Sequence, residues 1–552
     1  FFLNHSKDMS LPPLTPIFEI EWKSTIEMHV ENRKRLYAAV GEDPRVGRNA
    51  IALFFGDLEW ERKVNDIEEI FRQESNFHYL FGVREPGYAA VMDFANKMTT
   101  LVVPFLPEEF GVWFGKIPTR DELADIYHVQ HAIYERDFFD FIEDRRPSIV
   151  HMLSYRNTDS GFTYSDYVRG NKTAMSLVKS IEKLDIPRVE HVLWPILREL
   201  RVFKTPAELA IMRTMNRVSS LAHIHVMRRT RPGMREFNME AEFKYVTQTL
   251  SGSRLWAYTP ICTVGSRSAI LHAGHAGMPN DERIKDGDMV MNDMGTELYC
   301  YASDITVTFP ANGKFTEKQA TIYNIVLDAN IACKGMMKAG VVWVDVHRKA
   351  YEIILTGLQK CGILKSESSM EGLVEDDIAA VFMPHGLGHL IGVDTHDVGG
   401  YDSFATRMLP SRPRDHGYRA LRTARTLEPG MVITVEPGLY FNDALLEAAK
   451  GDESMGRHIN FEVLDEYRAE IGGVRLEDNV VVLPDGIENL TVVPRTVEEV
   501  EAACRGEIMS FLDLPEDSPA LRHVIITEED RAKHAALAAA VRGESPVITS
   551  EH

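Results

Sequence analysis

Acidic residues at the ends of apolar runs in the second half of this chain limit the folds that it can adopt. Asp293 lies in the run M-V-M-N-D-M-G, and Asp304 precedes the run D-I-T-V-T-F. Burying an aspartate without a partner is costly, so the fold must supply a cation, a helix end or solvent beside each one. Either aspartate alone is typical of a turn or a strand edge. Because the two flank one predicted hairpin, a shared functional site is an equally good interpretation.

Three histidines follow in one glycine-rich segment, M-P-H-G-L-G-H-L-I-G-V-D-T-H-D-V-G-G, at positions His385, His389 and His396. The first two have an i, i+4 spacing, but the H-E-x-x-H zinc-protease pattern is absent because position 386 is glycine. Gly386 and Gly388 favour a loop over a helix. A single histidine of this kind usually belongs to the core, whereas three on so permissive a backbone indicate a site.

Two further carboxylates lie beside apolar strands. Glu436 ends V-I-T-V-E-P-G, and Glu477 lies in G-G-V-R-L-E-D between Arg475 and Asp478. Taken alone, either glutamate is equally well explained by an ion pair with Arg475.

Together these motifs supply four carboxylates and one imidazole: Asp293, Asp304, His389, Glu436 and Glu477. Four negative charges balance two divalent cations, which favours a dinuclear site over a single metal. Oxygen-rich ligation favours harder ions such as Mn²⁺ over zinc. Two metals that share a water lower its pKa and stabilise a tetrahedral oxyanion, so the pattern predicts hydrolysis of an acyl or phosphoryl bond.

The composition of the chain indicates which binding partners and which cellular compartment to expect. The chain has 552 residues, with 61 Lys and Arg against 82 Asp and Glu, a formal net charge of −21. This charge argues against a nucleic-acid partner. No apolar run approaches the ~20 residues that cross a bilayer, and no signal-peptide pattern opens the sequence, so we expect no membrane association and a cytoplasmic protein. The five cysteines are widely spaced and form no C-x-x-C pair, which is typical of thiols in a reducing compartment.

A helix start divides the chain. In R-V-F-K-T-P-A-E-L, Thr205, Pro206 and Glu208 occupy the N-cap, first and third positions of a predicted long helix that reaches the arginines before Pro232. Short apolar runs such as 51–55 and 101–103 alternate with helical stretches before this point, which predicts an N-terminal α/β domain over residues 1–195. The part from 200 to 505 is predicted to be α+β or mixed, and residues 506–552 form an acidic, alanine-rich tail.

Several elements of the second part have recognisable limits. Thr316 with Gln319 predicts a helix that ends near Gly340, and Asp345 predicts another that stops by Gly362. Strands are expected at 289–295, 305–309, 431–436 and 474–483, and one more helix at 527–541.

The order D-x10-D, H-G-L-G-H, E-P-G, R-L-E-D resembles the metallopeptidases of the pita-bread fold, which include methionine aminopeptidase, aminopeptidase P and prolidase. Blocks outside these motifs resemble the eukaryotic Xaa-Pro dipeptidase (prolidase) family: F-R-Q-E-S-N-F-H-Y-L-F-G-V-R-E-P-G, N-T-D-S-G, R-V-F-K-T, H-A-G-M-P-N-D and V-P-R-T-V-E-E. The similarity covers roughly residues 20 to 505. It implies an N-terminal α/β domain followed by a pita-bread catalytic domain.

The resemblance also implies roles for individual residues. Asp304 and Glu477 would bridge two metals, which the resemblance implies to be Mn²⁺. Asp293 would chelate one, and His389 with Glu436 would complete the other. His272 and His396 would hold the scissile carbonyl and the oxyanion. The substrate pocket would contain Arg422, which grips the free carboxylate, together with Tyr258 and Arg475.

The implied reaction is hydrolysis of an Xaa-Pro dipeptide by a hydroxide held at the metals, with Glu436 as proton shuttle and proline as product. Two departures from the family pattern, Ala273 and Thr296, replace no ligand but reshape the pocket. Two other functions stay open: an aminopeptidase P acting on longer Xaa-Pro peptides, and a non-enzymatic binding protein on the same fold. Family members are commonly homodimers, and Trp113 matches a loop that in prolidases reaches the partner subunit's site.

Overall fold

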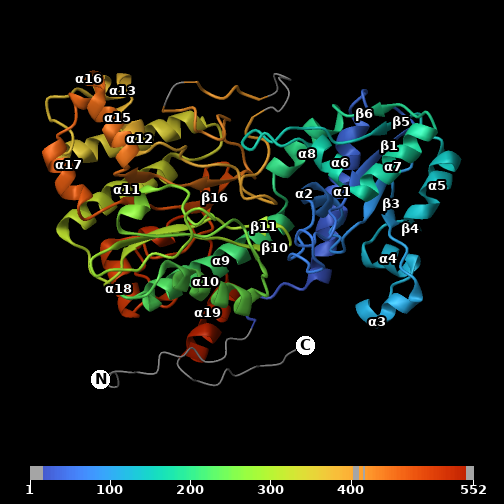
Figure 1. Cartoon of the computed structure of the whole chain (residues 1–552), viewed down its shortest axis with the longest axis horizontal. Helices are drawn as coiled ribbons and strands as arrows, with labels where there is room; N and C mark the ends of the chain where they lie inside the picture. The colour runs from blue at the N-terminus through green and yellow to red at the C-terminus, as the bar shows by residue number, and fades with distance from the viewer. Residues whose placement is uncertain (1–15, 402–408, 415–416, 542–552) are drawn as a thin grey trace.

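A computed structural model describes residues 16–401, 409–414 and 417–541 of the chain. Figure 1 shows the N-terminal half, in blue and teal, on one side of a larger part that holds the remaining strands between helices. The two parts meet along α8 (Leu193–Val202) and the start of α9 (Pro206–Arg229), where Arg201 ion-pairs with Asp394 and Asp397 and Arg35 lies 3.7 Å from Glu208.

The N-terminal half is built on one six-stranded sheet with the strand order β4-β3-β2-β1-β5-β6. Its central strand β1 (Ala50–Phe55) is buried at every position, pairs antiparallel with β2 and runs parallel to β5. Such a fully buried strand requires helices on both faces, which is the expected α/β arrangement. The other strands are β2 (Ala89–Asp93), β3 (Met98–Val103), β4 (His131–Tyr134), β5 (Ile149–His151) and β6 (Arg188–Val189). The helices are α1 (Ile26–Gly41), α2 (Ser75–Phe81), α3 (Gly111–Phe114), α4 (Arg120–Ile126), α5 (Phe138–Arg145), α6 (Tyr164–Gly170) and α7 (Lys172–Lys183).

The helix predicted at the boundary is present with its predicted cap. The side chain of Thr205 accepts from the backbone N–H of Glu208, and the Glu208 carboxylate accepts from the N–H of Thr205. Pro206 occupies the first turn, where its missing N–H costs nothing. α9 runs for 24 residues and is buried along much of its length, so it forms a floor for the second part.

The second part combines four small antiparallel sheets with two pairs of helices. Figure 1 shows α11 (Glu317–Met336) and α12 (Trp343–Lys360) above the strands and α9 with α10 (Glu236–Ser251) below them. The strands are β7 (Leu255–Trp256), β8 (Ile261–Val264), β9 (Met289–Asp293), β10 (Thr296–Leu298), β11 (Tyr301–Ala302), β12 (Thr306–Pro310), β13 (Val432–Val435), β14 (Gly438–Tyr440), β15 (Gly473–Arg475), β16 (Asp478–Leu483) and β17 (Gly486–Asn489). Smaller helices are α13 (Met370–Glu375), α14 (Ile378–Phe382), α15 (Asp443–Gly451), α16 (Glu453–Gly456) and α17 (Phe461–Arg468).

Some predicted limits were wrong. The first helix ends at Met336 rather than near Gly340, and the second begins at Trp343 instead of Asp345, which lies in its first turn. The strand predicted over 474–483 is two strands, β15 and β16, separated at residues 476–477. The break has a structural reason: β15 pairs with β14 while β16 pairs with β13, so the chain passes from one sheet to another at Glu477.

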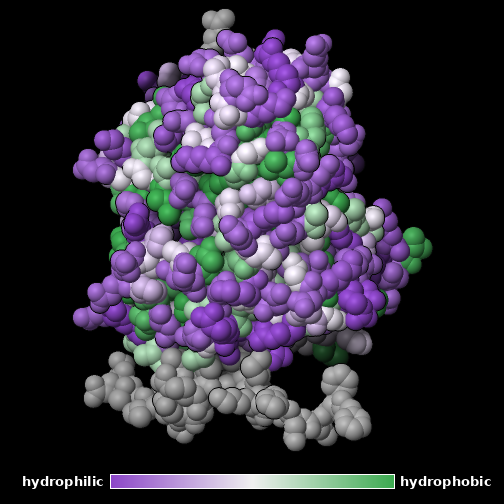
Figure 2. Space-filling view, turned by 90° about the vertical axis from the view of Figure 1, so that its left-hand side faces the viewer, coloured by the Kyte–Doolittle hydropathy of each residue, from purple (hydrophilic) through white to green (hydrophobic). Residues whose placement is uncertain are grey.

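The C-terminal segment folds against the second part through α18 (Val497–Arg505) and α19 (Glu528–Val541). Among the described residues, no helix is long and apolar enough to cross a membrane. Figure 2 shows one face of the molecule, on which hydrophilic residues predominate and hydrophobic residues are scattered rather than gathered.

Candidate metal and substrate site

Two adjacent strands position the two aspartates. β12 pairs antiparallel with β9 so that Thr306 lies opposite Asp293, and Asp304 lies two residues ahead of Thr306. The residues between the two strands form β10 and β11 in a separate sheet, so the strands do not make a simple hairpin. Both aspartates are nonetheless buried at the same end of the sheet.

Glu477 is fixed to the same place from another sheet. Its backbone N–H donates to the carbonyl of Thr306 at 3.1 Å, and its carboxylate accepts from the Thr306 hydroxyl at 2.7 Å. Buried Arg495 donates to the carbonyls of both residues. Glu477 therefore owes its position to the break between β15 and β16.

The histidine loop lies along β13. The backbone N–H of His389 donates to the Thr434 hydroxyl, and the N–H of Thr434 donates to the His389 carbonyl. A Cβ on Gly388 would lie 2.1 Å from the Thr434 carbonyl oxygen, so only glycine permits this approach. The N–H of Glu436 donates to the Leu387 carbonyl, which fixes the glutamate at the end of the same strand.

Three of the five predicted ligands form a compact group: ligand atoms of Asp304, His389 and Glu477 all lie within 4.8 Å of one another. His389 Nδ1 lies 3.1 Å from the Leu390 carbonyl, which can only accept, so Nδ1 carries the proton and Nε2 presents a lone pair. That lone pair lies 3.3 Å from an Asp304 oxygen and 3.6 Å from a Glu436 oxygen. A hydrogen bond from the opposite ring nitrogen is the usual orientation of a metal-binding histidine.

The electrostatics of this group require a compensating cation. Burial, reinforced by neighbouring carboxylates, raises the pKa of Asp304, Glu436 and Glu477 well above their ordinary values. Burial lowers the pKa of His389 to about 4, so the imidazole is neutral and supplies no positive charge. Neutral imidazole and carboxylate oxygens are the donors that divalent metals bind, and the residues present therefore fit a metal centre.

Asp293 differs from the other acids of the group because it forms an ion pair with an arginine. Its two oxygens lie 2.7 Å from Arg475 Nη2 and 2.5 Å from the Tyr258 hydroxyl. The interpretation that pairs Arg475 with Glu436 or Glu477 was wrong: the arginine ion-pairs with Asp293 and donates to the Tyr440 hydroxyl. Arg475 thus orients Asp293 toward the group of ligands.

All of the predicted site residues line one cavity of about 820 Å³. The set comprises the expected metal ligands Asp293, Asp304, His389, Glu436 and Glu477 and the expected substrate contacts Tyr258, His272, His396, Arg422 and Arg475. The departure residue Ala273 also lines this cavity, whereas Thr296 is buried and bonded to Ser253 and Ser303. A cavity of this size accommodates a small peptide.

Three uncharged histidines surround the ligand group. Burial lowers the pKa of His385 to about 3 and that of His396 to about 2, and it also lowers the pKa of His272. A nearby arginine adds to each shift. Neutral imidazoles can donate a hydrogen bond to a carbonyl or oxyanion without adding charge. His385 Nδ1 lies 2.8 Å from the Gly386 carbonyl and so carries the proton, which leaves Nε2 to accept from the Tyr440 hydroxyl at 3.0 Å. The sequence motif contains His385, but the predicted site did not include it.

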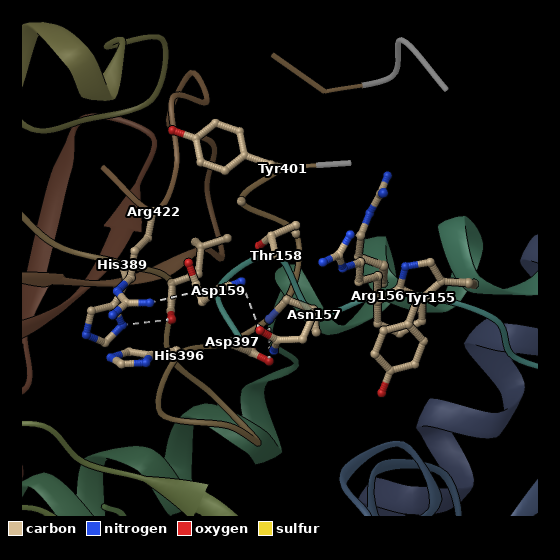
Figure 3. A pocket seen from close by; sticks show the side chains of 16 residues that line it. Tyr155, Arg156, Asn157, Thr158, Asp159, His389, His396, Asp397, Tyr401 and Arg422 are labelled. Atoms are coloured by element: carbon tan, nitrogen blue, oxygen red, sulfur yellow. Dashed lines mark hydrogen bonds and ion pairs between the residues drawn. The ribbon is translucent and has the colours of Figure 1, made fainter. Parts of the chain in front are cut away.

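Among the lining residues that the sequence interpretation missed are two charged ones, Asp159 and Arg412. Asp159 belongs to the N-terminal half and ion-pairs with Arg422 and Arg412 across the cavity wall. Figure 3 shows Asp159 and Arg422 pointing toward one another beside His389 and His396. The available signal was the block N-T-D-S-G, which resembles the dipeptidase family although no ligand lies in it.

Comparison with known proteins identifies the family. The sequence profile of metallopeptidase family M24 matches residues 210–484, and that of the aminopeptidase P N-terminal domain matches residues 29–148. The Xaa-Pro dipeptidase of Homo sapiens is 43% identical over 484 residues, which cover 88% of this chain and 94% of the relative. The chain belongs to the Xaa-Pro dipeptidase family of M24 metallopeptidases.

More distant members share the fold. A probable Xaa-Pro aminopeptidase of Talaromyces stipitatus is 34% identical over 448 residues, covering 80% of this chain and 90% of the relative. The solved structure of an aminopeptidase from Pseudomonas aeruginosa superposes with a TM-score of 0.70 at 31% identity, covering 89% of this chain and 99% of the other. Zinc-substituted Escherichia coli aminopeptidase P with bound product gives a TM-score of 0.69 at 27% identity, covering 88% and 99%. The expected order, an α/β domain and then a pita-bread metallopeptidase domain, is confirmed.

Proposed function

We propose that this metallopeptidase hydrolyses Xaa-Pro dipeptides and releases proline. The observation that carries the proposal is the pairing, in one cavity, of a metal-ligand group with arginine side chains able to bind a free carboxylate. The 43% identity with an Xaa-Pro dipeptidase supports the same substrate class. Since proline lacks an amide hydrogen, the cavity need not supply an acceptor for the scissile nitrogen.

The residues that would hold divalent metals are Asp293, Asp304, His389, Glu436 and Glu477, of which Asp304, His389 and Glu477 have ligand atoms within 4.8 Å of one another. Divalent metals bound there lower the pKa of water and polarise the scissile carbonyl. The oxygen-rich donor set, four carboxylates to one imidazole, favours Mn²⁺ over Zn²⁺.

The protein's own groups have separate roles. Arg422 binds the substrate's terminal carboxylate, as a guanidinium can do with two parallel hydrogen bonds. His272 and His396 hold the carbonyl oxygen as it gains negative charge. Glu436, whose carboxylate is partly accessible in the cavity, accepts a proton from water and passes it to the departing proline nitrogen. Tyr258 and Arg475 hold Asp293 in place.

The experiment that tests this function compares Gly-Pro with the tripeptide Gly-Pro-Ala after loading with Mn²⁺. We expect kcat/KM to be higher for the dipeptide, because only its prolyl residue carries a carboxylate for Arg422. A clear preference for the tripeptide would instead identify an aminopeptidase P. Absence of both hydrolysis and bound metal would indicate a binding protein.

We further propose a homodimer and a cytoplasmic location. The loop near Trp113 supports the first: Val112, Trp113 and Phe114 are 81%, 80% and 64% exposed, a degree that favours a covering partner. Five free cysteines support a reducing compartment. Light scattering of the full chain tests the dimer, and a monomer mass at micromolar concentration would contradict it.

A further inference from the structure

Asp159 reaches the substrate cavity from the N-terminal half of the chain. It lies between β5 and α6, in a turn that the side chain of Asn157 stabilises by accepting from the backbone N–H groups of Asp159 and Ser160. A backbone bond from Gly161 to Asn157 closes the turn. These bonds hold Asp159 toward the catalytic half, as Figure 3 shows.

The Asp159 carboxylate lies between two arginines. One oxygen lies 2.8 Å from Arg422 Nη1 and the other 3.0 Å from Arg412 Nη2. Arg412 is itself held by the Leu421 carbonyl and by the ring of Tyr401. Burial raises the pKa of Asp159, but the charges of Arg422 and Arg412 outweigh it and hold the pKa below its ordinary value. Asp159 is therefore ionised at neutral pH.

Asp159 therefore occupies the guanidinium group of Arg422, to which a substrate carboxylate would bind. Asp159, Arg412 and Arg422 all line the cavity that holds the metal ligands, and their side chains are 30%, 32% and 26% exposed. Two guanidinium groups and one carboxylate leave a net charge of +1, which matches one further carboxylate. Any such ligand is attracted by the arginines and repelled by Asp159 at close range.

We propose that Asp159 is a specificity-determining residue, an internal carboxylate that competes with the terminal carboxylate of the dipeptide and of released proline for Arg422. This proposal deepens the proposed function and rests on the assignment of Arg422 as the carboxylate-binding residue. Because the dipeptide and the released proline both carry a terminal carboxylate, the competition weakens the binding of both. It therefore favours the departure of proline after each turnover. A ligand with a neutral C-terminal group is not subject to this competition.

The test replaces Asp159 by asparagine, which keeps the size and one hydrogen-bond acceptor but removes the charge. In the Mn²⁺-loaded enzyme, we expect the KM for Gly-Pro and the inhibition constant of free proline to fall together by about three- to tenfold. The KM for glycyl-prolinamide, which has no carboxylate, stays within about twofold. Asp159→Ser should shift the first two constants in the same direction.

Asp166→Asn is the matched control. Asp166 lies in the same region of the N-terminal half and ion-pairs with Arg169, but it does not line the cavity. We expect it to leave all three constants unchanged. Thermal unfolding of each variant shows whether it is folded.

A rise in the KM for Gly-Pro, no change, or an equal shift for glycyl-prolinamide would overturn the proposal, because each result would assign Asp159 a merely structural part. Failure of the proposed function gives a different result: the wild-type enzyme would then prefer the tripeptide. Calorimetric titration of proline and prolinamide into wild type and Asp159→Asn still measures the charge effect in that case. Equal proline affinities would overturn it there too.

Discussion

At the scale of single residues, the site is defined by charges that cannot remain uncompensated. Asp304 and Glu477 are 5% and 1% exposed, and their carboxylates face each other and His389 within 4.8 Å. Asp478, a buried carboxylate outside this group, has two cations beside it: it lies between Lys334 and Arg495. This contrast explains why Asp304 and Glu477 require a metal and Asp478 does not.

Replacing Asp304 or Glu477 by alanine should therefore abolish bound metal at one or both positions. We expect kcat/KM for Gly-Pro to fall by at least about a hundredfold, because the remaining ligands cannot balance two cations. Elemental analysis of the purified variants measures the metal directly. Asp328→Ala, on the exposed face of α11, serves as control and keeps both metal and activity. Unchanged activity in Asp304→Ala would refute the ligand assignment.

Arg422 should act on binding and not on metal content. In Arg422→Ala, we expect the KM for Gly-Pro to rise at least about tenfold while kcat changes little, since the lost contact is present in both ground and transition states. The metal stoichiometry should equal that of the wild type. A loss of metal together with activity would show that Arg422 supports the ligand group instead.

Among the helices and strands, sequence motifs predicted the limits that are set by contacts within one turn of the chain. The cap of α9 was exact because Thr205 and Glu208 satisfy each other within one turn. The division of residues 474–483 was not visible, because Leu476 and Glu477 continue the alternation of apolar and charged residues that Val474 and Arg475 begin. Only the pairing with two different sheets separates β15 from β16. The same holds for the site: the motifs predicted side chains that line one cavity, whereas Asp159 enters it through the packing of the two halves. The domain limits near residues 195 and 505 stay a prediction.

The C-terminal helix α19 supplies a pH-dependent contact. His534 is 1% exposed, its ring packs against Phe18 and Phe511, and neither ring nitrogen has a hydrogen-bond partner among the described residues. Burial, with nearby Arg217 and despite Asp530, lowers the pKa of His534 to about 3. Below pH 6.5 the unfolded chain binds a proton that the folded chain does not. The contribution of His534 to the free energy of unfolding is therefore complete above pH 6.5 and declines as the pH falls toward 3.

His534→Phe should remove this dependence. Between pH 6.5 and 5, we expect the midpoint of thermal unfolding to fall less in the variant than in the wild type, with a difference of up to about 1.4 kcal/mol per pH unit in the free energy of unfolding. His131→Phe is the control, because His131 is exposed and should not alter the slope. Parallel curves for wild type and His534→Phe would contradict the prediction.

At the scale of the whole molecule, a chain of ion pairs joins the two halves behind the cavity. Arg72 of the N-terminal half lies 2.8 Å from Glu297 and 3.5 Å from Asp394 of the second part. Arg201, at the end of α8, ion-pairs with both Asp394 and Asp397. These two aspartates flank His396 in the sequence, so the contact between the halves also holds the segment that carries this cavity-lining histidine.

Arg72→Met should weaken the contact between the two halves, because it leaves Glu297, whose side chain is 3% exposed, without its cation. We expect the free energy of unfolding to fall by roughly 2–4 kcal/mol. The loss is smaller than for a fully buried pair, because about a third of the Arg72 side chain faces solvent. The double variant Arg72→Met, Glu297→Leu should recover much of that loss, since no buried charge is left unpaired. Urea titrations that follow the first unfolding transition measure the stability of both variants. A double variant no more stable than Arg72→Met would show that the unpaired charge of Glu297 does not cause the loss. In the single variant kcat/KM for Gly-Pro should also fall, because Asp394 loses a cation that orients the segment before His396.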